Sequence, residues 1–175
     1  LTVTILPVND APVATTGLTG NTNEDQSIVV NLSGSDIDGD NLTFSLDGDA
    51  STGSVSIDGS IATYTPTSNY NGDDSFVFTV SDGELTDTAS VTLTIIPVND
   101  APILATVSDI SFDEDTSGSL SVSGSDIDGD GLTYSITAGT DITATVDGTD
   151  VLFSAPSNFN GSESFTITLS DGEYT

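Results

Sequence analysis

The chain begins with LTVTILPVNDAP, at Leu1–Pro12, and the same string returns as VTLTIIPVNDAP at Val91–Pro102, 90 positions later. Two further strings recur near this spacing, SGSDIDGDNLTFSL (33–46) as SGSDIDGDGLTYSI (123–136) and, after one deletion, PTSNYNGDDSFVFTVSDGE (66–84) as PSNFNGSESFTITLSDGE (156–173). Several matches at one spacing are the mark of tandem units. The sequence therefore predicts two homologous units, one after the other.

Apolar and polar residues alternate within each unit. Val91, Leu93 and Ile95 alternate with threonines, and Phe76, Phe78 and Val80 show the same period of two. This period is typical of half-buried strands, and the Asp-Gly and Asn-Gly pairs between such stretches are typical of turns. No stretch has the apolar period of a helix. About seven strands in a unit of this size predict an all-β fold, a tandem of immunoglobulin-like β-sandwiches.

The string Pro-Val-Asn-Asp-Ala-Pro separates the units. Two prolines stiffen it and remove ladder donors, so we interpret it as a short, semi-rigid linker. The predicted organisation is a last strand of a preceding unit or a donor strand (1–6), a linker (7–12), a first repeat (13–96), a second linker (97–102), and a second repeat that lacks its last strand (103–175).

The two ends of the chain carry complementary signals. Leu1–Ile5 aligns with Val91–Ile95, the last strand of a unit, whereas the corresponding strand after Glu173 would begin near position 180. No signal peptide precedes Leu1, so we expect a processed product or a slice of something longer. Either the chain is one period of an array, or subunits exchange this strand. In both cases we expect Leu1–Ile5 not to pack against the chain's own sandwiches.

The net charge of the chain limits the classes of molecule that it can bind. It has 28 acidic residues, no Lys, Arg, His or Cys, and a formal net charge of −28. Nucleic acid and anionic membrane surfaces are bound through Lys and Arg, so we expect neither partner, and no apolar run is long enough for membrane insertion. Because no side-chain cation is present, crowded carboxylates must stay solvated or bind a metal ion.

The loop Asp-Ile-Asp-Gly-Asp is the strongest metal motif. It places Asp36 and Asp38 in the first unit, and Asp126 and Asp128 in the second, at alternate positions before a glycine. Hard carboxylate oxygens and a tight turn are what Ca²⁺ coordination needs. The alternative is that such residues only form turns, which we prefer for the isolated pair Asp58-Gly59. The sequence leaves open whether the last Asp of each loop, Asp40 or Asp130, is a ligand.

The order of the acidic motifs resembles that of cadherin repeats. More closely it resembles the bacterial cadherin-like, PVNDAP-linked tandem repeats of large secreted adhesins or extracellular filaments, over essentially the whole chain. The resemblance implies cadherin-like sandwiches with Ca²⁺ bound at the junctions. We favour the array because such linkers usually lie inside long chains. Cadherins have Asp-Arg-Glu where this chain has Asn-Gly-Asp-Asp or Asn-Gly-Ser-Glu, which leaves the mid-unit ligand and the number of ions open.

The resemblance also implies the ligands, which lie in three groups. Around the second linker they are Glu24, Asp74, Asn99, Asp100, Asp126, Asp128 and Asp171. Asn9, Asp10, Asp36, Asp38 and Asp82 would face a preceding unit, and Glu114 and Glu163 a following one.

A calcium-stiffened extracellular spacer is the function that this arrangement favours. Without calcium the ligands repel one another and the joint flexes, whereas with calcium they form a shared clamp. Extracellular modules bind Ca²⁺ with a Kd of roughly 10⁻⁴–10⁻³ M, so the sites would fill on export. We expect a secreted or cell-surface location and end-to-end partners, either neighbouring repeats or identical subunits. A carbohydrate or cell-surface ligand would bind elsewhere in the parent protein.

Three other functions are compatible with parts of the sequence. Subunits could form a filament by donor-strand exchange through residues 1–5, or the threonine-rich strand Thr88–Thr94 could bind carbohydrate or ice. The amino-acid composition also permits a glycosidase with paired carboxylates. Such an enzyme, however, needs aromatic side chains against which the sugar rings can stack. Trp is absent and aromatic residues make up 6% of the chain. We therefore expect no enzyme activity.

Overall fold

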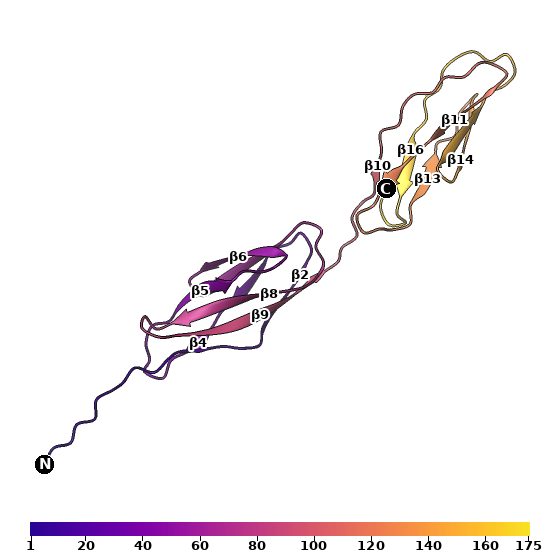
Figure 1. Ribbon diagram of the computed structural model, residues 1–175. Coiled ribbons are helices and arrows are strands. Elements are labelled where there is room, and N and C mark those ends of the chain that lie inside the picture. Colours follow the sequence, from indigo (N-terminus) through magenta and orange to yellow (C-terminus); the bar gives the residue numbers. More distant parts are fainter. The chain divides into compact units, whose positions relative to one another are not determined.

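The computed structural model describes residues 1–175, which form strands and no helix. The chain divides into two compact units, Leu1–Val98 and Asn99–Thr175 (Figure 1). The strands of the first unit begin at Val13, and those of the second begin at Ile103. No helix suited to crossing a membrane is present. The prediction of an all-β tandem of immunoglobulin- or cadherin-like sandwiches is confirmed.

The first unit contains two main sheets. Its strands are β1 (Val13–Ala14), β2 (Leu18–Asn23), β3 (Ile28–Asn31), β4 (Gly34–Ser35), β5 (Thr43–Gly48), β6 (Gly53–Asp58), β7 (Ile61–Pro66), β8 (Gly72–Ser81) and β9 (Thr86–Ile96). One sheet has the order β2-β9-β8-β5, the other has the order β3-β7-β6, and β1 pairs with β4. Strand β2 runs parallel to β9, and the remaining pairs are antiparallel.

The core of the first unit follows the predicted alternation. Val91, Leu93 and Ile95 on β9 are at most 1% exposed, and Phe76 and Phe78 on β8 are equally buried. Strands β8 and β9 lie side by side (Figure 1). The threonines and serine between the buried β9 residues are exposed. Because β9 lies between β2 and β8, its inward face closes the sandwich over the core.

The second unit has shorter strands and a smaller core. Its strands are β10 (Ile103–Leu104), β11 (Ser117–Ser121), β12 (Gly124–Ser125), β13 (Thr133–Ile136), β14 (Thr143–Asp147), β15 (Asp150–Ser154) and β16 (Ile167–Ser170). They pair as β11-β15-β14, β10-β12 and β13-β16. The described residues include no counterpart of β9. The residues equivalent to β2 and to the first half of β8, 108–113 and 161–166, form no strand, whereas β2 and β8 in the first unit both pair with β9.

Residues 1–12 belong to no strand. Leu1, Val3 and Ile5 are 121, 78 and 91% exposed. Their counterparts in β9, Val91, Leu93 and Ile95, are almost wholly buried. The same alternating sequence is thus solvated at the start of the chain and forms the core of the first unit 90 residues later.

Candidate metal centres

The carboxylate of Asp36 builds the acidic loop that follows β4. Its Oδ1 accepts the backbone N–H groups of Asp38, Gly39 and Asp40 at 2.8, 3.1 and 3.3 Å. Gly39 has a φ of 84°, a conformation that favours glycine. The other oxygen, Oδ2, is buried and has no hydrogen-bond partner. One oxygen of Asp36 therefore orders the loop, and the second is available for a ligand that is not a protein donor.

Asp38 and Asp40 complete an acidic cluster with Asp36. One carboxylate oxygen of each lies within 4.8 Å of the others. Two oxygens bound to one Ca²⁺ at 2.3–2.6 Å lie at most roughly 5 Å apart, so this spacing fits a shared ion. The structure therefore brings Asp40, which the sequence left open, into the same group as Asp36 and Asp38.

The linker pair Asn9-Asp10 is attached to this cluster. The N–H of Asp10 donates to Asp38 Oδ2 at 2.8 Å, and Asn9 Nδ2 donates to Asp82 Oδ2 at 3.0 Å. Asp82 Oδ1 accepts the N–H groups of Leu85 and Glu84, each at 2.7 Å. These two donors hold the pKa of Asp82 below its usual value, so the carboxylate is ionised. The structure thus links the linker pair to Asp38 and to Asp82 by one hydrogen bond each, and it groups Asp36 and Asp38 with Asp40.

The second unit reproduces this arrangement. Asp126 Oδ1 accepts the N–H groups of Asp128, Gly129 and Asp130 at 2.9, 3.0 and 3.3 Å, and its Oδ2 is buried without a partner. Asp126, Asp128 and Asp130 also offer oxygens within 4.8 Å of one another. The same fine geometry therefore arises from both copies of the motif.

The second linker pair also repeats the contacts of the first. The N–H of Asp100 donates to Asp128 Oδ2, and Asn99 Nδ2 donates to Asp171 Oδ2, both at 2.8 Å. Desolvation raises the pKa of Asp171, but the N–H groups of Tyr174 and Glu173 outweigh it and bring the pKa below its usual value. Asn99 and Asp100 are thus held by the unit that follows them in sequence.

Glu24, like Asp36 and Asp126, has a buried carboxylate oxygen without a hydrogen-bond partner. It follows β2, is 4% exposed, and its Oε1 accepts the N–H of Val98 at 2.6 Å. Its backbone N–H donates to Ile96 at the end of β9. Its Oε2 is buried and has no hydrogen-bond partner. Glu24 therefore lies against the residue that immediately precedes Asn99 and Asp100.

Glu114, the counterpart of Glu24, is exposed. In the first unit the carboxylate is buried by its contact with the chain just after β9, and no such segment is described after β16. Glu24 and Glu114 therefore have different surroundings in the described residues, although their sequence positions are equivalent.

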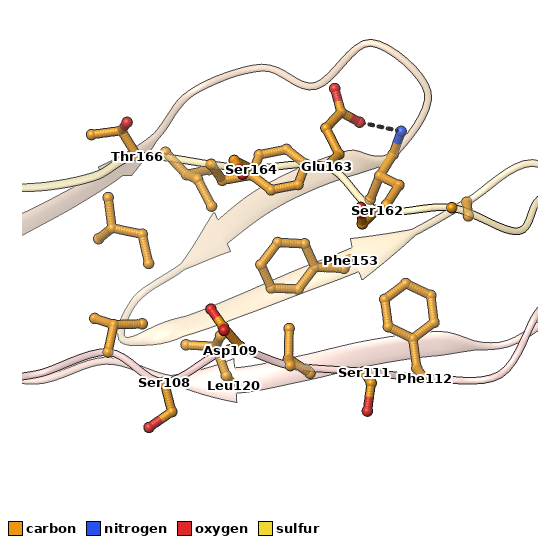
Figure 2. A pocket seen from close by; sticks show the side chains of 18 of the residues that line it. Ser108, Asp109, Ser111, Phe112, Leu120, Phe153, Ser162, Glu163, Ser164 and Thr166 are labelled. Atoms are coloured by element: carbon orange, nitrogen blue, oxygen red, sulfur yellow. Dashed lines mark hydrogen bonds between the residues drawn. The ribbon is translucent and has the colours of Figure 1, made fainter.

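Asp74 and Glu163 hold loops instead of lying in the acidic clusters. Asp74 is 8% exposed and accepts the N–H groups of Ser51, Thr52 and Ser75 and the hydroxyls of Thr52 and Tyr64. Glu163 accepts the N–H groups of Thr140, Asp141 and Ile142, and Figure 2 shows one of these contacts as a dashed line. Neither residue belongs to a group of three acids within ligand distance.

The bond between Tyr64 and Asp74 is the most buried polar contact in the first unit. Tyr64 is fully buried and donates its hydroxyl to Asp74 Oδ2 at 3.0 Å. Burial raises the pKa of Asp74, but the Thr52 hydroxyl and three backbone donors outweigh it and lower the pKa to about 2. Burial raises the pKa of Tyr64 to about 12. Sequence reasoning did not find this pair, because its partners come from separate strands with no shared motif.

A family profile described as the bacterial Ig domain matches residues 9–94 and 99–175. The chain is also similar to chitinase A of Pseudoalteromonas piscicida, with 30% identity over 171 residues. The match covers 94% of this chain and 20% of the chitinase, so the chain spans about one fifth of the length of that relative.

Solved cadherin structures share the fold. Drosophila N-cadherin EC1-4 is similar with a TM-score of 0.63 and 16% identity, over 92% of this chain and 45% of that chain. Human protocadherin-24 EC1-2 is similar with a TM-score of 0.57 and 20% identity, over 93% and 94% of the two chains. At these identities the likeness shows the fold alone.

The family match and the sandwiches agree with each other. Each matched range lies within one unit, and each unit is built of paired strands without helices. Domains of this kind are generally non-catalytic and typical of extracellular proteins. The chain belongs to the bacterial Ig domain family, as two consecutive copies of its fold.

Proposed function

We propose that this chain is a non-catalytic, calcium-binding spacer of an extracellular adhesin or surface filament. In this role each unit binds ions at the end that carries the linker pair and the acidic loop. The bound ions restrain the linker, and the tandem extends a functional part of the protein away from the surface to which it is attached.

The observation that carries this proposal is the buried, unpartnered oxygen at the centre of each acidic loop. Asp36 Oδ2 and Asp126 Oδ2 are buried and accept no hydrogen bond. A buried carboxylate oxygen without a partner is costly, and each of these has two further carboxylates beside it. The chain has no Lys, Arg or His that could compensate for this charge. A bound divalent cation satisfies the orphan oxygen and removes the repulsion at once.

The donor set favours Ca²⁺ over other divalent ions. The candidate ligands are Asp36, Asp38, Asp40 and Asp10 with Asn9 and Asp82 beside them, and Asp126, Asp128, Asp130 and Asp100 with Asn99 and Asp171 beside them. All are oxygen donors, which hard cations prefer, and Ca²⁺ accepts six to eight of them in flexible geometry. Mg²⁺ demands a near-ideal octahedron and keeps several waters.

Glu24 connects this chemistry to the linker. Its Oε1 binds the N–H of Val98, while the next residue in sequence, Asn99, donates to Asp171. Its Oε2 is a second buried oxygen without a protein donor. We assign Glu24 as a further candidate ligand at its end of the first unit. We assign Asp74 and Glu163 to loop support, because each accepts several backbone N–H groups of a neighbouring loop and neither lies in a group of three acids within ligand distance.

Calcium titration with a structural readout tests the proposal. Isothermal calorimetry should detect binding with a Kd of roughly 10⁻⁴–10⁻³ M. Small-angle scattering in 10 mM CaCl₂ and in excess chelator, at matched ionic strength, should show a narrower distribution of end-to-end lengths with calcium. Identical scattering and no binding heat in calcium would refute the spacer role.

The similarity to chitinase A raises a second candidate, an accessory module of a polysaccharide-degrading enzyme. The outer face of β9 carries a row of exposed hydroxyls, on Thr88, Ser90, Thr92 and Thr94. Hydroxyl rows can contact sugars, but threonine also suits any exposed strand. Co-sedimentation with chitin distinguishes the two candidates, since a spacer remains in the supernatant with and without calcium.

A further inference from the structure

The first unit joins its first long strand to its last strand in parallel. Strand β2 pairs over all six of its residues with residues 91–96, the second half of β9. In a parallel pair, the start of one strand and the end of the other lie at opposite ends of the sheet. The chain enters the unit ahead of β2 and leaves it after β9, so tension along the chain pulls these two strands past each other.

The pairing of β2 with β9 is the contact that this tension must break. Strand β1, which precedes β2, pairs with β4 over two residues only. On the other side of β9, strand β8 is bound over ten residues, and it is connected to the exit of the unit only through β9 itself. Because the β2–β9 pairing is shorter and lies directly between entry and exit, tension separates β2 from β9 before it separates β8 from β9.

We propose that the β2–β9 pair is a shear clamp, a contact by which the first unit resists extension, and this inference rests on the proposed spacer role. When two paired strands are pulled along their length, the hydrogen bonds between them are loaded together. When an antiparallel pair is pulled apart from one end, its bonds break one after another. A single hydrogen bond contributes little to stability, so resistance to tension requires that several break at once. The parallel pair provides this arrangement.

Close packing reinforces the shear clamp on its inner face. Gly20 is buried within β2, and a Cβ at this position would lie 3.0 Å from Leu93 and 3.1 Å from Ile28. Core side chains therefore lie directly against the backbone of β2. Since they keep water away from this face of the ladder, its hydrogen bonds are in a less polar environment and are electrostatically stronger than bonds exposed to water.

Two carboxylate side chains fasten the ends of the loaded path. At the entry, Asp87 of β9 accepts the N–H of Ala14, in β1, at 2.9 Å. At the exit, the N–H of Glu24 donates to the carbonyl oxygen of Ile96 at 2.9 Å, and Glu24 Oε1 accepts the N–H of Val98. The chain is thus bound to β9 before β2 begins, and to the end of β2 after β9 ends. Hydrogen bonds to carboxylates are stronger than neutral ones, so both ends resist fraying.

Single-molecule force spectroscopy of the 175-residue chain in excess chelator tests the proposal, with handles attached to pairs of engineered cysteines, since the chain has none of its own. Handles at Val8→Cys and Pro97→Cys pull β2 and β9 past each other. Handles at Gln26→Cys and Thr67→Cys pull on the start of β3 and the end of β7, which lie at the same end of an antiparallel pair. At one loading rate, the unfolding force of the first unit should be at least about twofold higher in the first geometry, because several hydrogen bonds break together there. Equal forces in the two geometries would overturn the proposal.

Substitutions locate the resistance through the ratio of the two unfolding forces. Thr22→Pro removes a backbone N–H from β2, so the ratio should fall to about one. Asp87→Ala removes only the bond to Ala14 and should lower the ratio less, and it decides the matter if Thr22→Pro does not fold. The matched control, Asp58→Ala at an exposed turn, should keep the wild-type ratio. A wild-type ratio in the folded β2 and β9 variants would overturn the proposal. Because the measurements are made without calcium, their outcome is independent of calcium binding.

Discussion

Replacing Asp36 by Asn separates the two roles of this carboxylate. The side-chain oxygen of Asn can still accept the three N–H groups that order the loop, now bound by Oδ1. The substitution removes the negative charge and replaces the unpartnered Oδ2 by an amide, which can donate but cannot bind a cation. We therefore expect opposite effects on stability in the absence and presence of calcium.

The expected magnitudes come from the geometry of the cluster. Asp36 has two carboxylate neighbours with oxygens within 4.8 Å. Each like-charge pair at this distance costs about 0.9 kcal/mol in bulk water, and screening at 0.15 M salt roughly halves it. Removing two pairs should therefore stabilise the calcium-free unit by about 1 kcal/mol. An ion present at 100 times its Kd stabilises the wild-type unit by about 2.7 kcal/mol, and the variant should lose most of this gain.

Differential scanning calorimetry in 10 mM CaCl₂ and in excess chelator measures both effects. For a unit of this size, 1 kcal/mol corresponds to about 4–8 °C in Tm. The wild-type first unit should gain about 10–20 °C with calcium, while Asp36→Asn should start a few degrees higher and gain little. Asp58→Asn, which removes the same charge from an isolated turn, is the control and should respond as the wild type does. A calcium response of Asp36→Asn equal to that of the wild type would refute the reasoning.

Three further predictions concern two carboxylates outside the clusters, Glu24 and Asp74, and the tyrosine that donates a hydrogen bond to Asp74, Tyr64. Glu24→Gln should weaken calcium binding roughly tenfold in calorimetry, because it removes a buried ligand oxygen, whereas Glu114→Gln, at the exposed equivalent, should not change it. Asp74→Asn should destabilise the first unit by about 2 kcal/mol at pH 7 in urea unfolding followed by circular dichroism. Because the folded pKa of Asp74 is about 2, below its usual value of 3.8, its contribution is present above about pH 4 and is lost as the pH falls through 2, so wild type and variant should converge there. Tyr64→Phe should cost about 1–2 kcal/mol, since its hydroxyl binds a buried carboxylate, whereas Tyr70→Phe, which loses an exposed bond to a carbonyl, should cost less than about 0.5.

Local patterns in the sequence predicted most of the fold. The alternation around Val91 and Phe76 requires one face of each strand to be buried, and the structure buries these faces. The repeat spacing then transfers each feature from one unit to the other. The parallel pairing of β2 with β9 could not be predicted, because LTGNTN at Leu18–Asn23 has too few apolar residues to indicate a buried strand. In the structure β2 is ordered by its six-residue pairing with β9, which comes from the other end of the unit.

The acidic clusters were predictable because their residues lie close together in sequence. Asp36 and Asp38 occupy one short loop, so any fold that keeps the turn keeps them near each other. The role of Asp74 depends instead on donors from Ser51, Thr52 and Tyr64, which only the folded sandwich brings together. The resemblance implied a metal ligand at this position, and the structure adds that both oxygens of this carboxylate accept hydrogen bonds from protein donors. The number of donors around a carboxylate is a tertiary property that the motif does not encode.

The number of protein donors around each carboxylate separates the acidic residues discussed above into three kinds. The first kind has both oxygens engaged by protein donors. Asp74 and Glu163 in this way support loops, and Asp82 and Asp171 hold a turn and a linker asparagine. Isolated turn residues such as Asp58 are exposed to water, which solvates their charge. Asp36 and Asp126 have one oxygen that orders the loop and one buried oxygen without a donor, so the hydrogen bonds that order the loop do not involve the second oxygen. Because preorganisation lowers the cost of ordering on binding, this third kind is where calcium affinity should be concentrated, and adding a protein donor to that oxygen should abolish binding while leaving the fold intact.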